Sequence, residues 1–254
     1  MGRARVEEKC FEIRLENGQV IRGVLHDAPN KQSPVVMVHG YFSSNKYGPA
    51  RLYVQISRVI ASSGFPVIRF DAIGFGDSDG EIHDTTPESM VRDTLAVINH
   101  YRALGYGPRF VLLGHSFGCN LSAIIAETDK AVKSLIVIAP VCEKGSKIRY
   151  FDQDQLDELH SRGFTFRKGF LTSEQYVRAI NEALGMNAAC NLGIPVTVIQ
   201  GQEDEFYSTN GGKELAKSCK NGRYIPIKKG DHNFMHPIAR LELLYALQPS
   251  IQSA

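Results

Sequence analysis

The stretch Arg109-Phe-Val-Leu-Leu-Gly114-His115-Ser116-Phe117-Gly118 decides the fold, because an apolar strand pattern runs directly into a Gly-x-Ser-x-Gly turn. A helical pattern over 119–127 follows at once. A serine between a strand and a helix requires a sharp, strained turn, and glycines two residues before and after it leave room for that turn. The turn lifts the hydroxyl above the sheet at a helix N-terminus, where negative charge is stabilised. We therefore predict that Ser116 is a nucleophile.

Short apolar runs alternate with helical patterns along the rest of the chain, which is typical of an α/β protein with a mostly parallel sheet and helices on both faces. Asn17-Gly18 separates the first two runs and favours a tight antiparallel hairpin, because both residues accept positive φ. Helical patterns cover about 50–62 and 86–104, the second with Thr86 as a cap and Pro87 at its first position. Strands are expected over 10–15, 20–26, 35–38, 67–70, 110–113, 135–138, 196–199 and 224–228.

One interval interrupts this alternation. Roughly fifty residues separate the run at 135–138 from the run near 194, which is too long for a plain connection. Helical patterns over 152–160 and 173–184 lie in it. We predict a helical cap insertion over about 141–193 within a single domain that spans 1–254; an ordinary surface excursion is the alternative. In this insertion, the side chains that could either bind a polar substrate group or form a solvated face are Asp152, Asp154 and Tyr176.

Composition narrows the class of partner. The 29 Lys and Arg residues nearly balance the 27 Asp and Glu residues, so no charge excess indicates a nucleic-acid partner. No run approaches the roughly 18 apolar residues of a membrane span, and the start shows no secretory pattern. The five cysteines include no C-x-x-C pair, which favours free thiols and a cytoplasmic location. Small molecules are the expected partners, and a homodimer built on the cap stays open.

A serine hydroxyl needs a general base, because it is a poor nucleophile at neutral pH. After the run at 196–199 comes Asp204, and after the run at 224–228 comes His232. Both follow strand C-termini, the edge where open α/β sheets place their sites. His232 would accept the Ser116 proton, and Asp204 would orient and stabilise the imidazolium. The rivals for these roles are the flanking carboxylates Glu203, Glu205 and Asp231.

Negative charge develops on the substrate carbonyl oxygen, so backbone N–H donors are needed beside it. The amide of Phe117, directly after the nucleophile, is one candidate. The second donor should come from the loop after the run at 35–38, where Gly40 lets the backbone turn. We predict the amide of Tyr41 for this role, with Phe42 as the second choice.

Other motifs have plainer interpretations. The glycine-rich segment 71–80 lacks both the P-loop Lys-Ser/Thr and a third glycine at dinucleotide spacing, so a structural turn is expected. His236 follows His232 at helical spacing, but no third metal ligand accompanies the pair. His115 and Cys119 are expected to pack around the turn. No cofactor and no metal are predicted, because a Ser-His-Asp site needs only water.

The chain resembles the α/β-hydrolase superfamily, and within it the single-domain esterases with a serine-aminopeptidase-like (S33-type) core, which include bacterial cinnamoyl or feruloyl esterases. This resemblance implies an eight-stranded sheet and hydrolysis through an acyl-enzyme. The oxyanion segment begins His-Gly-Tyr, not the His-Gly-Gly-Gly of another esterase branch, so that branch's substrates are not carried over. The segments that carry the resemblance, in matching order, lie at 39–41, 71–80, 114–118, 201–204 and 230–232.

These observations predict a serine hydrolase that cleaves a carboxylic ester of a small or medium acyl or aryl-acyl group (a carboxylesterase, EC 3.1.1) through an acyl-enzyme on Ser116. A thioesterase, an amidase or an acyltransferase would use the same three residues, so the sequence leaves these open. A ligand-binding protein that keeps the fold without turnover is the alternative from another class.

Overall fold

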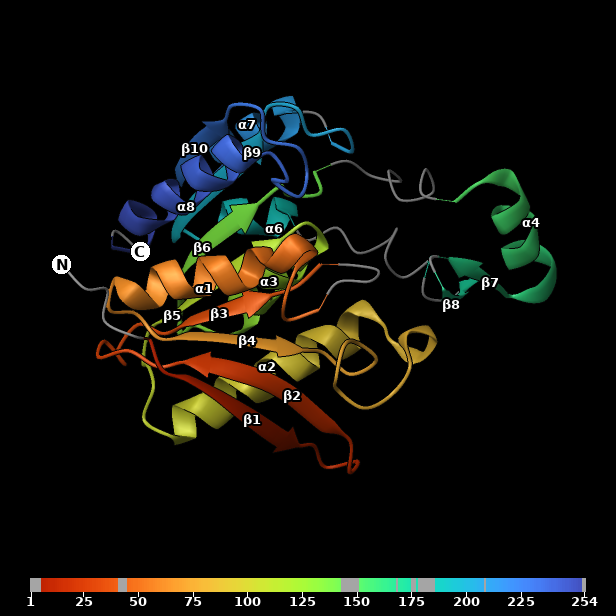
Figure 1. Cartoon of the computed structure of the whole chain (residues 1–254), viewed down its shortest axis with the longest axis horizontal. Coiled ribbons are helices and arrows are strands. Elements are labelled where there is room, and N and C mark those ends of the chain that lie inside the picture. The colour runs from red at the N-terminus through yellow and green to blue at the C-terminus, as the bar shows by residue number, and fades with distance from the viewer. Residues whose placement is uncertain are drawn as a thin grey trace.

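The computed structural model describes residues 6–40, 45–142, 151–167, 169–174, 177, 186–207 and 209–252. Its main sheet has eight strands in the order β1-β2-β4-β3-β5-β6-β9-β10 (Figure 1). β2 pairs antiparallel with β1 and β4, and the remaining neighbours are parallel. The predicted eight-stranded, mostly parallel sheet is therefore confirmed. The strands are β1 Glu8–Arg14, β2 Val20–His26, β3 Val35–Val38, β4 Val67–Asp71, β5 Phe110–His115, β6 Val132–Ile138, β9 Pro195–Gly201 and β10 Asn221–Ile227.

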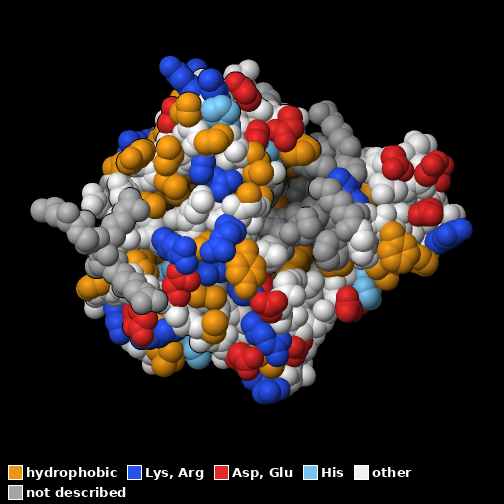
Figure 2. All heavy atoms as spheres, viewed as in Figure 1, with side chains coloured by type: hydrophobic (Ala, Val, Ile, Leu, Met, Phe, Trp, Pro, Cys, Tyr) orange, Lys and Arg blue, Asp and Glu red, His pale blue; other side chains and the backbone are white. Residues whose placement is uncertain are grey.

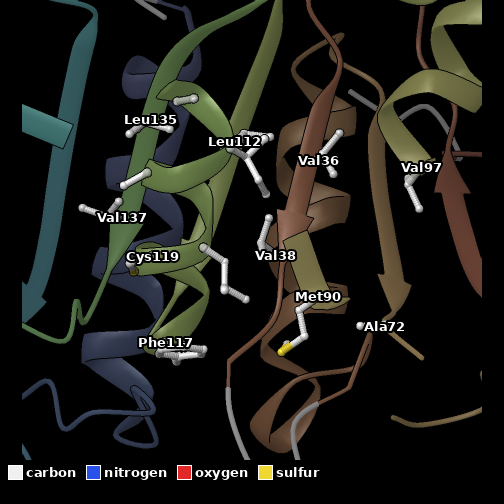
Figure 3. Close-up of a cluster of buried hydrophobic side chains, with 14 of the residues drawn as sticks. Val36, Val38, Ala72, Met90, Val97, Leu112, Phe117, Cys119, Leu135 and Val137 are labelled. Atoms are coloured by element: carbon white, nitrogen blue, oxygen red, sulfur yellow. The ribbon is translucent and has the colours of Figure 1, made fainter. Parts of the chain in front are cut away.

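Helices cover both faces of this sheet. Alternate residues of β3 enter two different clusters: Val36 packs against the helices of one face and Val35 against those of the other. Successive side chains of a strand point to opposite faces of the sheet, which gives this period of two. Because helices bury the side chains on both faces, the sequence of β3 is continuously apolar. Figure 3 shows the first cluster, in which Leu112 lies between Val36 and Leu135 of the two neighbouring strands. One face carries α1 (Leu52–Ser62) and α8 (Pro237–Gln252); the other carries α2 (Pro87–Ala103), α3 (Phe117–Thr128), α6 (Met186–Asn191) and α7 (Thr209–Ser218).

Local signals in the sequence explain where the helices begin. Thr86 caps α2: its side chain accepts from the amide of Ser89, and Ser89 in turn bonds the Thr86 amide. Pro87 occupies the first helical position, where a missing N–H costs nothing. The pattern expected over 50–62 begins with the short helix η1 (Pro49–Arg51) and continues as α1. The capping chemistry read from the sequence therefore sets the start of α2.

The segment between β6 and β9 carries α4 (Gln153–Arg162) and a two-stranded antiparallel hairpin of β7 (Phe164–Arg167) and β8 (Phe170–Ser173), which lie to one side of the main sheet in Figure 1. α4 matches the helix expected over 152–160. The hairpin was not predicted, although the alternation of exposed Phe164 and Phe166 with buried Thr165 is a period-two signal. Most of the helix expected over 173–184, with Tyr176, lies outside the described residues.

This hairpin contacts the body of the protein through Ser173. The Ser173 hydroxyl donates to the carbonyl of His83 at 3.2 Å, in the short helix η2 (Ile82–Asp84) that follows β4. Asp152 begins α4 and accepts from the amide of Gln155 at 2.8 Å, so its side chain serves as a helix cap. Asp154 is exposed in the first turn of the same helix.

The face of the molecule seen in Figure 2 is mixed in charge. Figure 2 shows Lys and Arg side chains interspersed with Asp and Glu side chains over the face of Figure 1. Across the described ranges, no helix reaches the length and apolar character that crossing a membrane would require.

Candidate active site

Ser116 lies on the turn between β5 and α3, in a backbone conformation that side chains rarely adopt. Its φ is 55° and its ψ is −124°, a strained combination that persists only where the surroundings hold it. The Ser116 amide donates to the carbonyl of Ile138 at 2.9 Å, which ties the turn to the end of β6. Gly118 lies against the backbone of Val38, where a Cβ would collide. Gly118 therefore lets the start of α3 approach the end of β3 directly beside Ser116.

His232 lies between β10 and α8 and faces Ser116. Its Nε2 is 3.0 Å from the Ser116 hydroxyl oxygen, and its Nδ1 is 3.0 Å from a carboxylate oxygen of Asp204. The Asp204 carboxylate can only accept, so Nδ1 carries a hydrogen, and Nε2 of the neutral ring is left to accept from the serine hydroxyl. The structure thus brings together the three side chains that the sequence singled out, from three separate loops.

Asp204 follows β9, and its side chain is fully buried. One carboxylate oxygen, Oδ1, accepts from the amides of Phe206 at 3.0 Å and Tyr207 at 3.1 Å. The other, Oδ2, faces the ring of His232. Because the backbone holds one oxygen, the carboxylate is fixed in the orientation that serves the imidazole.

The rival residues have other roles in the fold. The Glu205 carboxylate accepts from the amide of His232 at 3.3 Å and does not contact its ring. Asp231 accepts from the amides of Asn233 and Met235, as a cap of the turn after His232. His236 accepts from the amide of Ile238 at 3.3 Å. Within the ranges that the structure covers, no group of three potential metal ligands is found.

Gly40, which follows β3, lies directly beside Ser116. A Cβ on Gly40 would lie 3.2 Å from the Ser116 Cβ and 3.7 Å from its hydroxyl oxygen. His39 supports this loop: its Nδ1 donates to the carbonyl of Gly40 at 2.9 Å, and its Nε2 accepts from the amide of Ala72 at 3.1 Å. Burial lowers the pKa of His39, in keeping with a neutral ring that donates at one nitrogen and accepts at the other.

The two predicted oxyanion donors have different outcomes. Phe117 is the first residue of α3 and lies next to Ser116, so its amide is at the helix N-terminus. Tyr41, and Phe42 as the second choice, lie outside the described residues.

The segment 71–80 is a structural turn, as expected. Asp71 is fully buried and accepts from the backbone amides of Lys46 and Asp77. The Lys46 ammonium donates to both carboxylates, Asp71 and Asp77. Burial lowers the pKa of Lys46, but these two bonds outweigh it and leave the pKa above its ordinary value. Gly76 lies against Asp71 at a φ of 52°, where a Cβ would collide with the carboxylate.

His115 has more than the packing role that the sequence suggested. Its Nδ1 is 2.9 Å from the Tyr53 hydroxyl, and its Nε2 is 3.0 Å from the backbone carbonyl of His232. Burial, together with neighbouring His232, lowers the pKa of His115 to about 3. The position of His115 directly before Ser116 is visible in the sequence. Its partners are not predictable in this way, because they lie 62 and 117 positions away and no local pattern marks them. Cys119 is fully buried and packs in the core.

Aromatic side chains surround the imidazole of His232. The ring of Phe206 stands edge-on to it at 5.2 Å between centroids, and the ring of Tyr207 lies at 5.3 Å. Tyr207 is buried, whereas Phe206 is 40% exposed. Phe206 therefore offers an accessible apolar surface beside the imidazole.

The sequence pattern of the α/β-hydrolase fold matches residues 33–171, which is more than half of the chain. The chain belongs to the α/β-hydrolase fold family. A relative is the esterase EstD of Thermotoga maritima, 28% identical over 132 residues that make up 51% of this chain and 31% of EstD. Another is the mitochondrial palmitoyl-protein thioesterase ABHD10 of Pongo abelii, 23% identical over 195 residues, or 73% of this chain and 61% of that protein. The chain thus spans less than two thirds of either relative.

Solved structures agree with this assignment. Est1E of Butyrivibrio proteoclasticus, determined with ferulic acid bound, superposes with a TM-score of 0.78 at 20% identity, over 96% of both chains. At that identity the likeness establishes the shared fold, including the sheet and its flanking helices.

Proposed function

We propose that the protein is a serine hydrolase that cleaves carboxylic esters of a small or medium acyl or aryl-acyl group. The observation that supports this most is the pair of 3.0 Å contacts that link Ser116 to His232 and His232 to Asp204. A hydroxyl, an imidazole and a buried carboxylate in that order are the parts of a serine nucleophile, its general base and the group that orients the base.

In the acylation step, Nε2 of His232 accepts the hydroxyl proton as the Ser116 oxygen attacks the ester carbonyl carbon. Asp204 stabilises the imidazolium that forms. When the tetrahedral intermediate collapses, the bond to the alcohol oxygen breaks and His232 returns the proton to that oxygen. The alcohol leaves and the acyl group stays on Ser116.

Deacylation uses the same groups with water as the nucleophile. His232 takes a proton from water, the hydroxide attacks the acyl carbon, and the proton returns to the Ser116 oxygen as the acid leaves. In both steps the substrate oxygen becomes negative, and the amides of Phe117 and Tyr41 are proposed to donate to it. Losing one such donor costs about 3 kcal/mol of transition-state stabilisation.

The acyl or aryl-acyl preference is supported by the accessible Phe206 ring beside His232 and by the ferulic acid bound to the similar structure of Est1E. A thioester is the second candidate, because ABHD10 of Pongo abelii is named as a palmitoyl-protein thioesterase. Amide hydrolysis and acyl transfer would use the same three residues. Comparing oxyester, thioester and amide forms of one acyl group separates these activities.

The test is a series of p-nitrophenyl acyl and aryl-acyl esters, assayed with the wild type and with Ser116→Ala. The proposal predicts hydrolysis by the wild type and a loss of turnover on the order of a million-fold in the variant. A fluorophosphonate probe should label the wild type and leave Ser116→Ala unlabelled. If both proteins bind the esters with equal affinity and neither turns them over, the protein is a ligand-binding member of the family and the proposal is wrong.

A further inference from the structure

The backbone of His232 is held on both sides of its side chain. Its amide donates to the Glu205 carboxylate at 3.3 Å, and its carbonyl oxygen lies 3.0 Å from Nε2 of His115. Glu205 is exposed, whereas His115 is 2% exposed at the end of β5. A hydrogen bond shielded from water gains most from the low local dielectric. The His115 contact is therefore the stronger of the two.

Three groups are linked by hydrogen bonds here: the Tyr53 hydroxyl, the His115 ring and the His232 carbonyl. The chemistry of these groups determines which atoms carry the hydrogens. A backbone carbonyl only accepts, so Nε2 of His115 must carry the hydrogen that it donates to His232. In a neutral ring Nδ1 is then an acceptor, and the Tyr53 hydroxyl, 2.9 Å away, donates to it. Tyr53 is 1% exposed in α1. The His232 carbonyl thus fixes the tautomer of His115, and the Tyr53 hydroxyl matches that tautomer by donating to Nδ1.

His115 is not a second base for Ser116. Both of its ring nitrogens are engaged, one by the Tyr53 hydroxyl and one by the His232 carbonyl. The low pKa that burial gives His115 keeps the ring neutral across the physiological range. A neutral imidazole with both nitrogens engaged can orient a neighbour. It has no free lone pair that could accept the proton of Ser116.

We propose that Tyr53 and His115 form a positioning relay that holds the backbone of His232 and so sets the approach of its Nε2 to the Ser116 hydroxyl. The inference rests on the hydrolase function proposed above. The relay joins α1 and the end of β5 to the loop before α8. Tyr53 and His115 would therefore hold the base at a fixed position relative to the sheet. An imidazole displaced by about 1 Å loses much of its effect on rate.

The experiment measures kcat and KM for a p-nitrophenyl ester, together with the rate of fluorophosphonate labelling, in six proteins. Tyr53→Phe removes only the hydroxyl and should lower kcat and the labelling rate about tenfold, with KM within about twofold. His115→Leu should lower kcat about 100-fold. His115→Gln keeps an N–H donor on a side chain of similar length and should recover part of that loss. The other three proteins are the wild type, a matched control and a double variant, and the last two are described next.

Tyr106→Phe is the matched control, because the Tyr106 side chain is also buried and its hydroxyl donates at 3.0 Å to Asp27, which follows β2 and is not part of the site. It should leave kcat unchanged even if the melting temperature falls as in Tyr53→Phe. The decisive comparison is the double variant Tyr53→Phe/His115→Leu. If Tyr53 acts through His115, removing its hydroxyl has no further effect once the imidazole is gone.

The outcomes separate the relay from the proposed function. A wild type that neither hydrolyses the ester nor takes the label refutes the hydrolase proposal. An active wild type whose kcat and labelling rate are unchanged by Tyr53→Phe refutes the relay. The relay is also refuted if Tyr53→Phe lowers kcat by the same factor in the wild type and in the His115→Leu variant. If His115→Leu does not fold, the comparison of Tyr53→Phe with Tyr106→Phe decides alone.

Discussion

The backbone of Gly201 lies directly against the backbone of Gly230, and neither residue has room for a side chain. A Cβ on Gly230 would lie 2.8 Å from the Cα of Gly201. The amide of Glu203 also donates to the Gly230 carbonyl at 2.8 Å. Gly201 ends β9 and leads to Asp204, and Gly230 leads to His232. This contact therefore fixes how closely the carboxylate loop approaches the imidazole loop.

Replacing Gly201 with alanine tests that spacing. A methyl group there collides with the Gly230 carbonyl, so the two loops must move apart. We expect Gly201→Ala to lower the free energy of unfolding by about 1–3 kcal/mol and to lower kcat as well, since the Asp204 to His232 distance grows. Urea unfolding and ester hydrolysis measure the two effects. An alanine variant with unaltered kcat would mean that the loops are spaced by something else.

Gly40→Ala should affect activity more than stability. The new methyl would lie 3.2 Å from the Ser116 Cβ and 3.1 Å from the His115 carbonyl oxygen, so it crowds the place where a substrate must meet the hydroxyl. Neighbours at these distances need to shift by only a few tenths of an ångström. We expect a drop in kcat/KM of about tenfold or more with a melting temperature close to that of the wild type. Equal kcat/KM would show that substrate does not approach Ser116 past Gly40.

Lys46→Met should destabilise the protein strongly, because it leaves the carboxylate of Asp71 buried without its cation. Breaking one side of a buried pair costs about 3–5 kcal/mol. Adding Asp71→Asn should restore part of this loss, since the uncompensated charge is gone. Lys217→Met is the control: its pair with Glu214 is exposed on both sides, so a change within about 0.5 kcal/mol is expected. Equal effects of the two lysine variants would contradict the buried-pair account.

His26 should make stability depend on pH. Burial, and then the charge of Arg69, lowers the pKa of His26 from 6.5 to about 4. The unfolded chain therefore takes up a proton between these values while the folded protein does not, and the unfolding free energy falls as the pH falls. From pH 7 to pH 5 this loss is about 2 kcal/mol. His26→Gln should show a shallower decline than exposed His160→Gln in urea unfolding at both pH values. Parallel declines would refute the assignment.

The central strands of the sheet were predictable because they are buried on both faces. Continuous runs such as Val35–Val38 have no polar residue to confuse the pattern, and β3 begins and ends where the sequence indicates. The hairpin β7–β8 was missed because its alternation is only four residues long on each strand and follows a helical segment. The packing of the hairpin against η2 includes a contact between residues 90 positions apart.

The residues of the candidate site were predictable where they directly follow the C-terminal end of a strand. Ser116, Asp204 and His232 each follow a strand, and parallel strands bring their C-terminal ends to one edge. The supporting contacts were not predictable in the same way. The bond from His115 to the His232 carbonyl and the packing of Gly201 on Gly230 depend on three-dimensional approach, and neither residue type nor spacing encodes them. The roles of the amides of Tyr41 and Phe117 stay predictions.

The most direct test of the central claim is rapid acid quench of the wild type with a slowly hydrolysed aryl ester, followed by mass spectrometry of its peptides. The proposed hydrolase mechanism predicts that the acyl mass accumulates on the peptide containing Ser116, at Ser116 itself, within the time of one turnover, and that Ser116→Ala carries none. Hydrolysis at full rate with the acyl group on another side chain, or with no acylated peptide at any quench time, would contradict it.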